Sequence, residues 1–211
     1  IHNTGRIKAE GIGLHIRDID GTDGIGGAII HQSGVLEGGT GGIIVTGDFA
    51  TTAIEVSGLL KGGLGPAIST NASNDGIHIK SGSKIFGDIL TGAGDDVIRI
   101  DKGVQILGLI DTGSGNDTVF LGNAGYVVKG GAGDDIYYAG SGRDTFRYSA
   151  GDSGHDLLFG FDLRRDVLAL DVGPVDIRIT GGDTLLTWSE GSLRLVGVAS
   201  TDLDLSGAWI G

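Results

Sequence analysis

Hydrophobic and polar residues alternate in short pieces along most of the chain. In "GIHI" (76–79) and "VIRI" (97–100) two Ile residues flank one polar residue, and "TVFL" (118–121) repeats the spacing with Val119 and Leu121. A period of two residues is typical of a β-strand with one buried face. The residues expected to point outward from these pieces are His78, Arg99 and Phe120. No stretch shows a convincing 3.6-residue stripe, so the pattern predicts almost no helix.

The strand pieces recur at a spacing that shortens along the chain. Residues 33–46 align with 57–70 at an offset of 24, and 84–103 align with 105–125 at an offset of 21. The offset then falls to 18 between 112–120 and 130–138, and to 9 between 130–138 and 139–147. Such units cannot bury a face alone and must stack on one another. The repeat therefore predicts an all-β chain, a right-handed parallel β-helix or β-roll solenoid, with coils at 1–90 and a β-roll at 91–150.

The pattern changes after about residue 151. The remaining segment holds alternating strands, and the turn residues Gly181-Gly182-Asp183 and Ser189-Glu190-Gly191 separate strand pairs. Short Gly-containing turns between strands predict hairpins. We expect 151–211 to form an antiparallel cap, since the unpaired edge of a solenoid must be covered.

Four nonamers share a turn pattern in which the sixth residue is always Asp and the eighth is large and apolar. They are "TGAGDDVIR" (91–99), "TGSGNDTVF" (112–120), "GGAGDDIYY" (130–138) and "AGSGRDTFR" (139–147). Their second and fourth residues are Gly92, Gly94, Gly113, Gly115, Gly131, Gly133, Gly140 and Gly142, and their shared acidic residues are Asp96, Asp117, Asp135 and Asp144. The pattern is that of a calcium-binding β-helix repeat.

Calcium suits these turns chemically. Glycine lets the backbone turn tightly, and Ca²⁺ takes about 6–8 oxygens from carboxylates and carbonyls. Asp96, Asp117 and Asp135 are one coil apart, so we expect them in one ladder at one edge, with Asp144 on the opposite edge. The alternative is that Asp and Gly simply favour turns.

Composition and charge narrow the class of partner. Gly accounts for 43 of the 211 residues, and the formal net charge is −12. An acidic chain repels phosphates, so nucleic acid is not expected, whereas hard cations are. There is no Cys, and no run of 18 apolar residues predicts a membrane span. Residue 1 is Ile, so we expect a processed chain or a fragment of a longer one.

The nonamers resemble the RTX (haemolysin-type) calcium-binding family, and "GRDTFRYSAGDSGHDLLFGFDLRRDVLALD" (142–171) is similar to the segment that ends many of its β-rolls. The resemblance covers roughly 85–211. It implies a secreted, extracellular bacterial protein, exported by type I secretion through a C-terminal signal, that folds on meeting Ca²⁺ outside the cell. It also implies that Asp152 and Asp156 complete a terminal calcium site. Residues 1–90 resemble the Gly-rich coils of bacterial surface solenoids such as autotransporter passengers.

"DTGS" (111–114) shares its letters with the catalytic loop of aspartic proteases. The neighbouring units place Leu90 and Lys129 in the slot of Asp111, whereas Asp117 has an Asp in both neighbouring slots. A protease dyad needs two carboxylates that share a proton. The repeat therefore explains residues 112–117 as a calcium turn of the solenoid. Asp111 precedes this turn by coincidence and is not a catalytic residue.

The sequence favours a non-catalytic, calcium-binding structural or adhesive module of a bacterial cell-surface protein. Its expected partners are calcium ions, with cell-surface polysaccharide or self-assembly through the solenoid ends as further possibilities. Two other interpretations stay open: the last coils of a polysaccharide lyase or epimerase with an auxiliary calcium module, and an ice-binding array based on Thr46 and Thr70. Asp18, Asp20 and Asp23 form a turn that is a weak further cation site at most.

Overall fold

Every regular element of the described chain is a β-strand. The structure, a computed structural model, describes residues 1–17, 27–47, 51–200, 203 and 205–206. Asp18, Asp20, Asp23 and the turn predicted for them lie outside the described residues. Within the described part there is no helix with the length and apolar character that crossing a bilayer requires. The predicted all-β class is confirmed.

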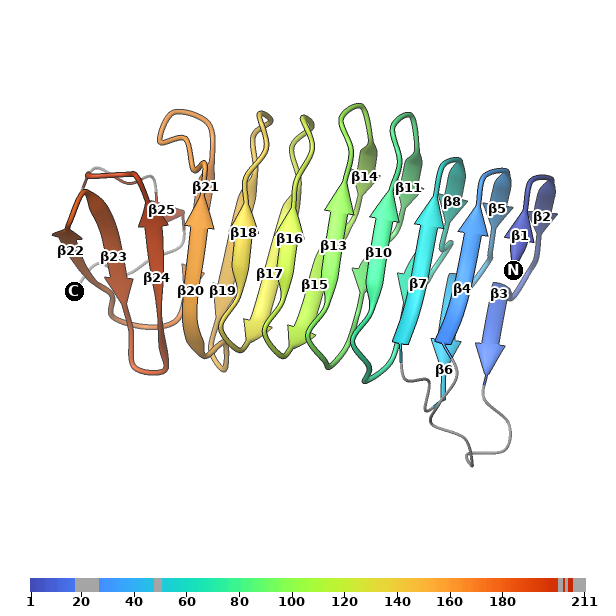
Figure 1. The fold of residues 1–211 in the computed structure, drawn as a ribbon, viewed down its shortest axis with the longest axis horizontal. Coiled ribbons are helices and arrows are strands. Elements are labelled where there is room, and N and C mark those ends of the chain that lie inside the picture. The colour runs from blue at the N-terminus through green and yellow to red at the C-terminus, as the bar shows by residue number, and fades with distance from the viewer. Residues whose placement is uncertain (18–26, 48–50, 201–202, 204, 207–211) are drawn as a thin grey trace.

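Three sheets run along the molecule, and the chain visits them in turn, so that it advances in stacked coils (Figure 1). The first sheet contains, in order, β1 (His2–Asn3), β4 (Gly27–Gln32), β7 (Thr51–Val56), β10 (Gly76–Ile79), β13 (Val97–Ile100), β16 (Thr118–Phe120), β18 (Ile136–Tyr138), β20 (Gly154–Phe159), β24 (Gly191–Val196), β23 (Asp183–Thr187) and β22 (Asp176–Thr180). The second contains β2 (Arg6–Lys8), β5 (Val35–Glu37), β8 (Leu59–Lys61), β11 (Lys84–Phe86) and β14 (Gln105–Leu107). The third contains β3 (Ile12–Arg17), β6 (Gly41–Thr46), β9 (Ile68–Ser69), β12 (Ile89–Leu90), β15 (Leu109–Ser114), β17 (Val127–Ala132), β19 (Thr145–Ser149), β21 (Val167–Asp171) and β25 (Leu205–Ser206).

Pairing between successive coils is parallel and follows the offsets read from the sequence. Ile77 is opposite Ile98, Ile98 is opposite Val119, and Val119 is opposite Tyr137. Coils contain three strands as far as β14 and two strands afterwards, because the second sheet ends there. The narrowing of the coil accounts for the fall in offset from 21 to 18. The coil that follows the first nonamer still contains a strand of the second sheet, β14. The coils therefore become narrower after β14 and not at residue 90.

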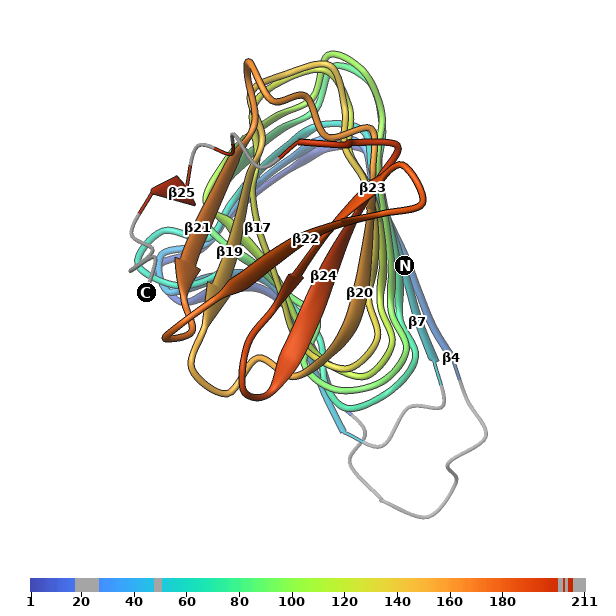
Figure 2. The same ribbon diagram turned by 90° about the vertical axis from the view of Figure 1, so that its left-hand side faces the viewer.

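The antiparallel part is smaller than the sequence predicted. Strands β22, β23 and β24 pair antiparallel across the two predicted turns. Strands β20, β21 and β24 instead continue the parallel sheets of the coils, so the segment from residue 151 is only partly a cap. Figure 2 shows β22 to β24 crossing the end of the stack.

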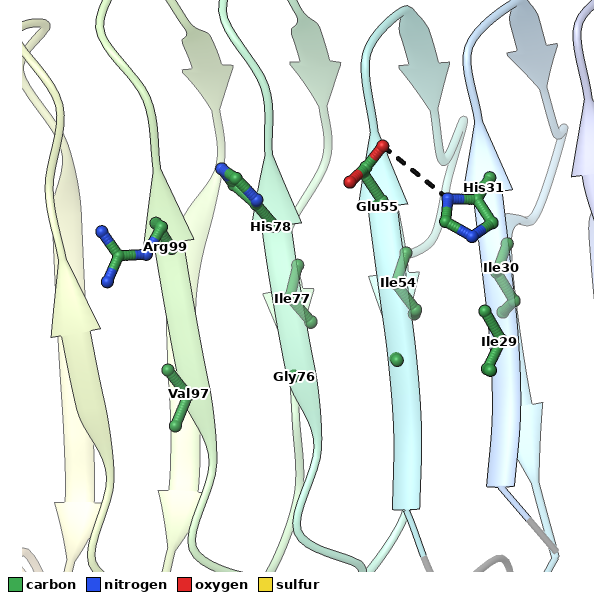
Figure 3. Close-up of a pocket in the computed structure, with 11 residues that line it drawn as sticks. Ile29, Ile30, His31, Ile54, Glu55, Gly76, Ile77, His78, Val97 and Arg99 are labelled. Carbon is green, nitrogen blue, oxygen red and sulfur yellow. Dashed lines mark ion pairs between the residues drawn. The ribbon is translucent and has the colours of Figure 1, made fainter.

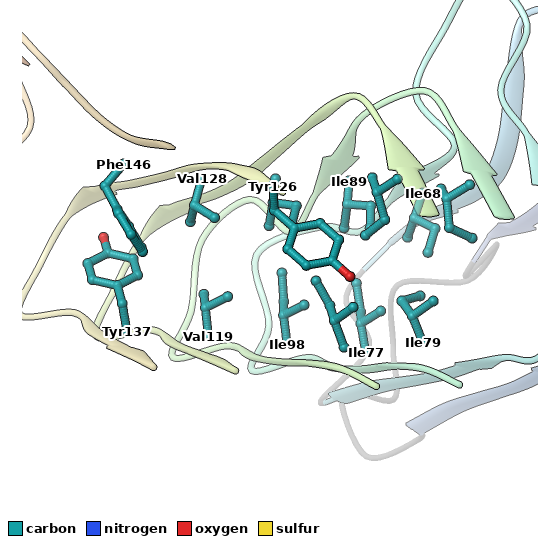
Figure 4. Packing of buried hydrophobic residues seen from close by; sticks show 14 of the residues in the cluster. Ile68, Ile77, Ile79, Ile89, Ile98, Val119, Tyr126, Val128, Tyr137 and Phe146 are labelled. Atoms are coloured by element: carbon teal, nitrogen blue, oxygen red, sulfur yellow. The ribbon is translucent and has the colours of Figure 1, made fainter. Parts of the chain in front are cut away.

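The two faces of each strand separate as the alternation predicted. His78 and Arg99 project outward beside Glu55 and His31 (Figure 3). Ile77, Ile98 and Val119 form a row of fully buried side chains in the first sheet, which Tyr137 continues, and the Phe146 ring contacts Tyr137 from the third sheet (Figure 4). Each such side chain contributes about 1.5–3 kcal/mol by leaving water.

The threonine pair proposed for ice binding does not form. The register places Ile43 opposite Ile68, an offset of 25, so Thr46 and Thr70 are not cross-strand neighbours. Thr70 is buried, and its hydroxyl donates to the carbonyl of Thr91. The ice-binding interpretation is therefore wrong.

Candidate metal-binding turns

The first three nonamers adopt one turn conformation. Their second and fourth residues all have positive φ, between 97° and 131°: Gly92, Gly94, Gly113, Gly115, Gly131 and Gly133. The fourth nonamer differs, because Gly140 and Gly142 are not among the positive-φ glycines. A side chain at either would run into the backbone of the preceding coil, as it also would at the glycines of the first three nonamers. Only the first three nonamers are therefore equivalent turns.

Asp96, Asp117 and Asp135 form the predicted ladder, and Asp75 and Asp156 extend it at its two ends; we call these five residues the inner ladder. In each step the Oδ1 atom of one aspartate accepts the backbone N–H of the aspartate one coil earlier, at 2.7–2.9 Å. At its start the N–H of Thr52 donates to Asp75. Every member is at most 4 % exposed. The carboxylates point into the stack and link the coils directly.

Asp75 is a member that the sequence analysis missed. "TNASNDGIH" (70–78) follows the nonamer pattern at Asp75 and Ile77, but Asn71 and Ser73 replace the two glycines. The Ser73 hydroxyl donates to Asp75 Oδ1 at 2.8 Å. The spacing of 21 residues to Asp96 was the signal that could have revealed it.

A second ladder runs beside the first on the exposed side of the same turns, and we call it the outer ladder. Asn74, Asp95, Asn116 and Asp134 each accept the N–H of the corresponding residue in the following coil, at 2.7–2.9 Å. Asparagine and aspartate alternate here, so an amide oxygen serves this hydrogen bond as well as a carboxylate does. The inner ladder uses aspartate at all five positions.

The inner carboxylates are incompletely satisfied. The Oδ2 atoms of Asp75, Asp96 and Asp117 are buried and have no hydrogen-bond partner, whereas Asp135 Oδ2 accepts from the Tyr137 hydroxyl at 3.0 Å. Burial, together with repulsion from neighbouring carboxylates, raises the pKa of Asp96 to about 7 and those of Asp117 and Asp135 to about 6. A buried carboxylate anion with one oxygen lacking a partner is costly, so these positions favour a proton or a cation.

Asp144 lies on the opposite edge, as predicted. Its Oδ1 accepts the N–H of Tyr126 at 3.1 Å, its Oδ2 accepts that of Gly140 at 3.0 Å, and its own N–H donates to Asp166 at 3.0 Å. Burial raises the pKa of Asp144 to about 6. Asp166, which the sequence analysis did not select, extends this shorter ladder.

Asp152 and Asp156 have different environments. Asp156 ends the inner ladder, and burial raises its pKa to about 7. Asp152 Oδ1 pairs with Lys129 at 3.2 Å, while its Oδ2 accepts from the N–H and the hydroxyl of Ser149. A role for Asp152 as a calcium ligand would require it to release these partners.

The turn carbonyls already form hydrogen bonds between coils. The carbonyl of Gly92 accepts from the N–H of Ser114 at 2.9 Å. The threonines that replace the first glycine of the pattern donate to the next coil, Thr91 to the carbonyl of Thr112 and Thr112 to that of Gly130. Each carbonyl has a second lone pair that remains available.

Side chains alone do not form a metal cage in the described part of the chain. No group of three or more His, Cys, Asp or Glu residues there is arranged to hold an ion. An ion at these turns would take one oxygen from each inner carboxylate and the rest from carbonyls and water. The unpartnered Oδ2 atoms fit that role.

The structure explains "DTGS" as part of the solenoid, but as the end of strand β15 (Leu109–Ser114), with the turn beginning at Gly115. Asp111 is opposite Leu90 in one neighbouring coil and Lys129 in the other. Burial raises the pKa of Asp111, and Lys129 opposes this effect. No carboxylate occupies either cross-strand position beside it.

Comparison with known proteins leaves this arrangement as the main guide to function. No protein-family model matches the chain. A search of the curated proteins also finds no match.

Proposed function

We propose that the chain is a calcium-binding structural module, in which metal ions at the turns hold successive coils together. The observation that carries the proposal is the inner ladder. Its hydrogen bonds need only a neutral acceptor, as Asn74 and Asn116 demonstrate in the outer ladder, yet all five positions hold aspartate. A bound cation that neutralises the buried carboxylates would explain why these positions hold aspartate and not asparagine.

The resident ion would supply positive charge between carboxylates that otherwise repel one another across one coil spacing. The residues that would hold it are Asp96 and Asp117 through their unpartnered Oδ2 atoms, and Asp135 through an Oδ2 atom that also accepts from the Tyr137 hydroxyl, together with carbonyls of the glycine turns. Asp75 and Asp156 extend the same ladder at its two ends. Calcium is the expected ion, because it accepts mixed carboxylate and carbonyl ligands in irregular geometry.

The wider setting rests on the resemblance to RTX proteins. We propose a secreted protein of the bacterial cell surface, exported by type I secretion and rigidified by calcium outside the cell, with a structural or adhesive role. The coils are taken as right-handed, as parallel crossovers nearly always are. Polysaccharide and further copies of the chain are the partners that such a surface module would meet.

Calcium is expected to raise the thermal stability of the chain strongly at neutral pH. Each site contributes about 1.4 kcal/mol when calcium is at ten times its Kd, so three or four sites give about 4–6 kcal/mol. The melting temperature should rise by roughly 10–20 °C relative to the protein in chelator. Circular dichroism melts with calcium, with magnesium and with chelator measure this. The same melting temperature in all three would contradict the proposal.

Replacing Asp117 by asparagine separates the charge from the hydrogen bond. The Asp117→Asn side chain can still accept the N–H of Asp96, but it carries no charge. We expect the melting temperature in chelator at pH 8 to rise by roughly 3–6 °C, and the shift produced by calcium to fall by roughly half. Asp171→Asn, at an exposed position of β21, is the matched control and should behave as the unmodified chain does. An unchanged calcium response in Asp117→Asn would place the ions elsewhere.

A further inference from the structure

A hollow of about 330 Å³ lies on the outer face of the first sheet, over β4, β7, β10 and β13 (Figure 3). Its floor is formed by Ala53 and Gly76, which are cross-strand neighbours and both face outward. The flanking strands hold Ile29 and Val97 in the same row, 60 % and 45 % exposed. The hollow exists because two neighbouring side chains are small in a row that is otherwise filled.

Gly76 has no structural reason to be glycine. It is the first residue of β10, where a residue with a side chain would favour the strand more, and it is not among the residues with positive φ. A Cβ atom added there would meet nothing within 4 Å. Among the glycines in the described strands it alone lacks both a positive φ and a crowding neighbour. One use of a glycine in a strand is to let a ligand approach the backbone closely.

One side of the hollow is polar, and each of its acidic groups already has a side-chain partner. Glu55 pairs with Lys80 at 3.1 Å and faces His31 at 3.7 Å, while His78 contacts Asp101 at 2.9 Å. His31, Glu55 and His78 form one row with Arg99 in the parallel register.

Arg99 is the unmatched member of that row. Its guanidinium forms no ion pair with a carboxylate in the described part of the chain, and it stacks over the Phe120 ring at 4.5 Å. Stacking fixes the plane of the guanidinium and leaves its N–H groups free for a planar anion. In a chain of net charge −12, the hollow is thus bordered by a pre-oriented positive group.

We infer that this hollow binds an acidic sugar unit of a polysaccharide, with its apolar ring face over Ala53 and Gly76 and its carboxylate at Arg99. A pyranose ring matches the site, because it has a C–H face for the small-residue floor and hydroxyl groups for Glu55, His31 and His78. A carboxylate is the group that Arg99 recognises with two parallel hydrogen bonds.

The occupant is inferred to be a polymer because the row continues along the molecule. Beyond Arg99 the same register positions hold Phe120, Tyr138 and Phe159, whose rings stack at 4.6 Å and 5.1 Å. Each strand step is about 4.8 Å, close to the advance of one pyranose unit along a chain. Successive sugar units could therefore follow successive coils.

Binding of short oligogalacturonate and oligomannuronate to the whole chain tests the inference, by calorimetry in calcium at neutral pH. We expect saturable binding, and much weaker binding of neutral cello-oligosaccharides of equal length. Gly76→Val fills the floor without disturbing the strand, and Arg99→Gln removes the charge. Each should weaken binding of the acidic oligosaccharide by about tenfold or more. Arg147→Gln, at an exposed arginine of the third sheet, is the matched control and should bind as the unmodified chain does.

Two readouts separate this site from the calcium turns. Gly76→Val and Arg99→Gln should keep the calcium-dependent melting shift, so their loss of binding cannot come from unfolding. Absence of binding by either acidic oligosaccharide, or equal binding to Gly76→Val, would overturn the inference. Equal affinity for the neutral oligosaccharides would overturn the role of Arg99. The calcium proposal stands or falls separately, on the melting experiment.

Discussion

The Gly113→Val chain is expected to be destabilised by more than about 4 kcal/mol, even in calcium. Gly113 has a φ of 97°, which a β-branched residue rarely adopts, and any Cβ there would overlap the carbonyl oxygen of Gly92 in the preceding coil. That carbonyl accepts the N–H of Ser114, so the collision would also break a hydrogen bond between coils. Urea unfolding followed by circular dichroism measures the loss.

The same substitution at Gly76 is the matched control. Gly76 has neither a positive φ nor a close neighbour, and valine favours strands. Gly76→Val should therefore unfold at the same urea concentration as the unmodified chain or at a higher one. Coincident transitions for the two variants would show that coil contacts at the turns do not limit stability.

In chelator, the chain is expected to lose stability as the pH rises from about 5 to 8. Burial raises the folded-state pKa of Asp117, Asp135 and Asp144 to about 6 and that of Asp96 and Asp156 to about 7. Because these values exceed the ordinary 3.8, the folded state binds more protons than the unfolded state in this window. The stabilisation is complete below the unfolded pKa and is lost as the pH passes through 6 to 7. Each carboxyl contributes about 1–2 kcal/mol after solvent screening, and the five together rival the usual 5–15 kcal/mol of a domain.

Calcium should remove most of this pH dependence, since an ion replaces the lost protons at pH 8. Melting temperatures at pH 5, 6, 7 and 8, with calcium and with chelator, give the comparison. Asp117→Asn should flatten the curve in chelator. If stability in chelator instead rose with pH, the inner carboxylates would have to be favourably ionised without a metal, and the ladder would need no cation.

The periodicity made much of the fold predictable. Inward and outward residues, the parallel register and the ladder of Asp96, Asp117 and Asp135 all follow from residues that recur at fixed offsets, because stacked coils must repeat the same inner surface. Asp75 was missed because the glycines that usually accompany the aspartate are Asn71 and Ser73, and serine there serves as a hydrogen-bond donor. A pattern based on glycine could not reveal a turn that is built from different residues.

The sequence could not reveal how each position is used. The fourth nonamer has the same pattern of Gly and Asp residues. Gly140 and Gly142 nevertheless allow close packing against the preceding coil and do not adopt a left-handed turn conformation. The hollow could not be predicted either, since it depends on Ala53 and Gly76 being opposite each other while their neighbours are large. Such features come from pairing between strands that are more than 20 residues apart.

The coil arrangement has a mechanical consequence. Contacts join each coil mainly to the one before and the one after, so a pulling force on the two ends would load the coils one after another. The chain would then lengthen in discrete steps as single coils peel away, each step releasing about 70–75 Å of extended chain for a 21-residue coil. A protein built in this way yields to tension gradually and need not rupture as a whole.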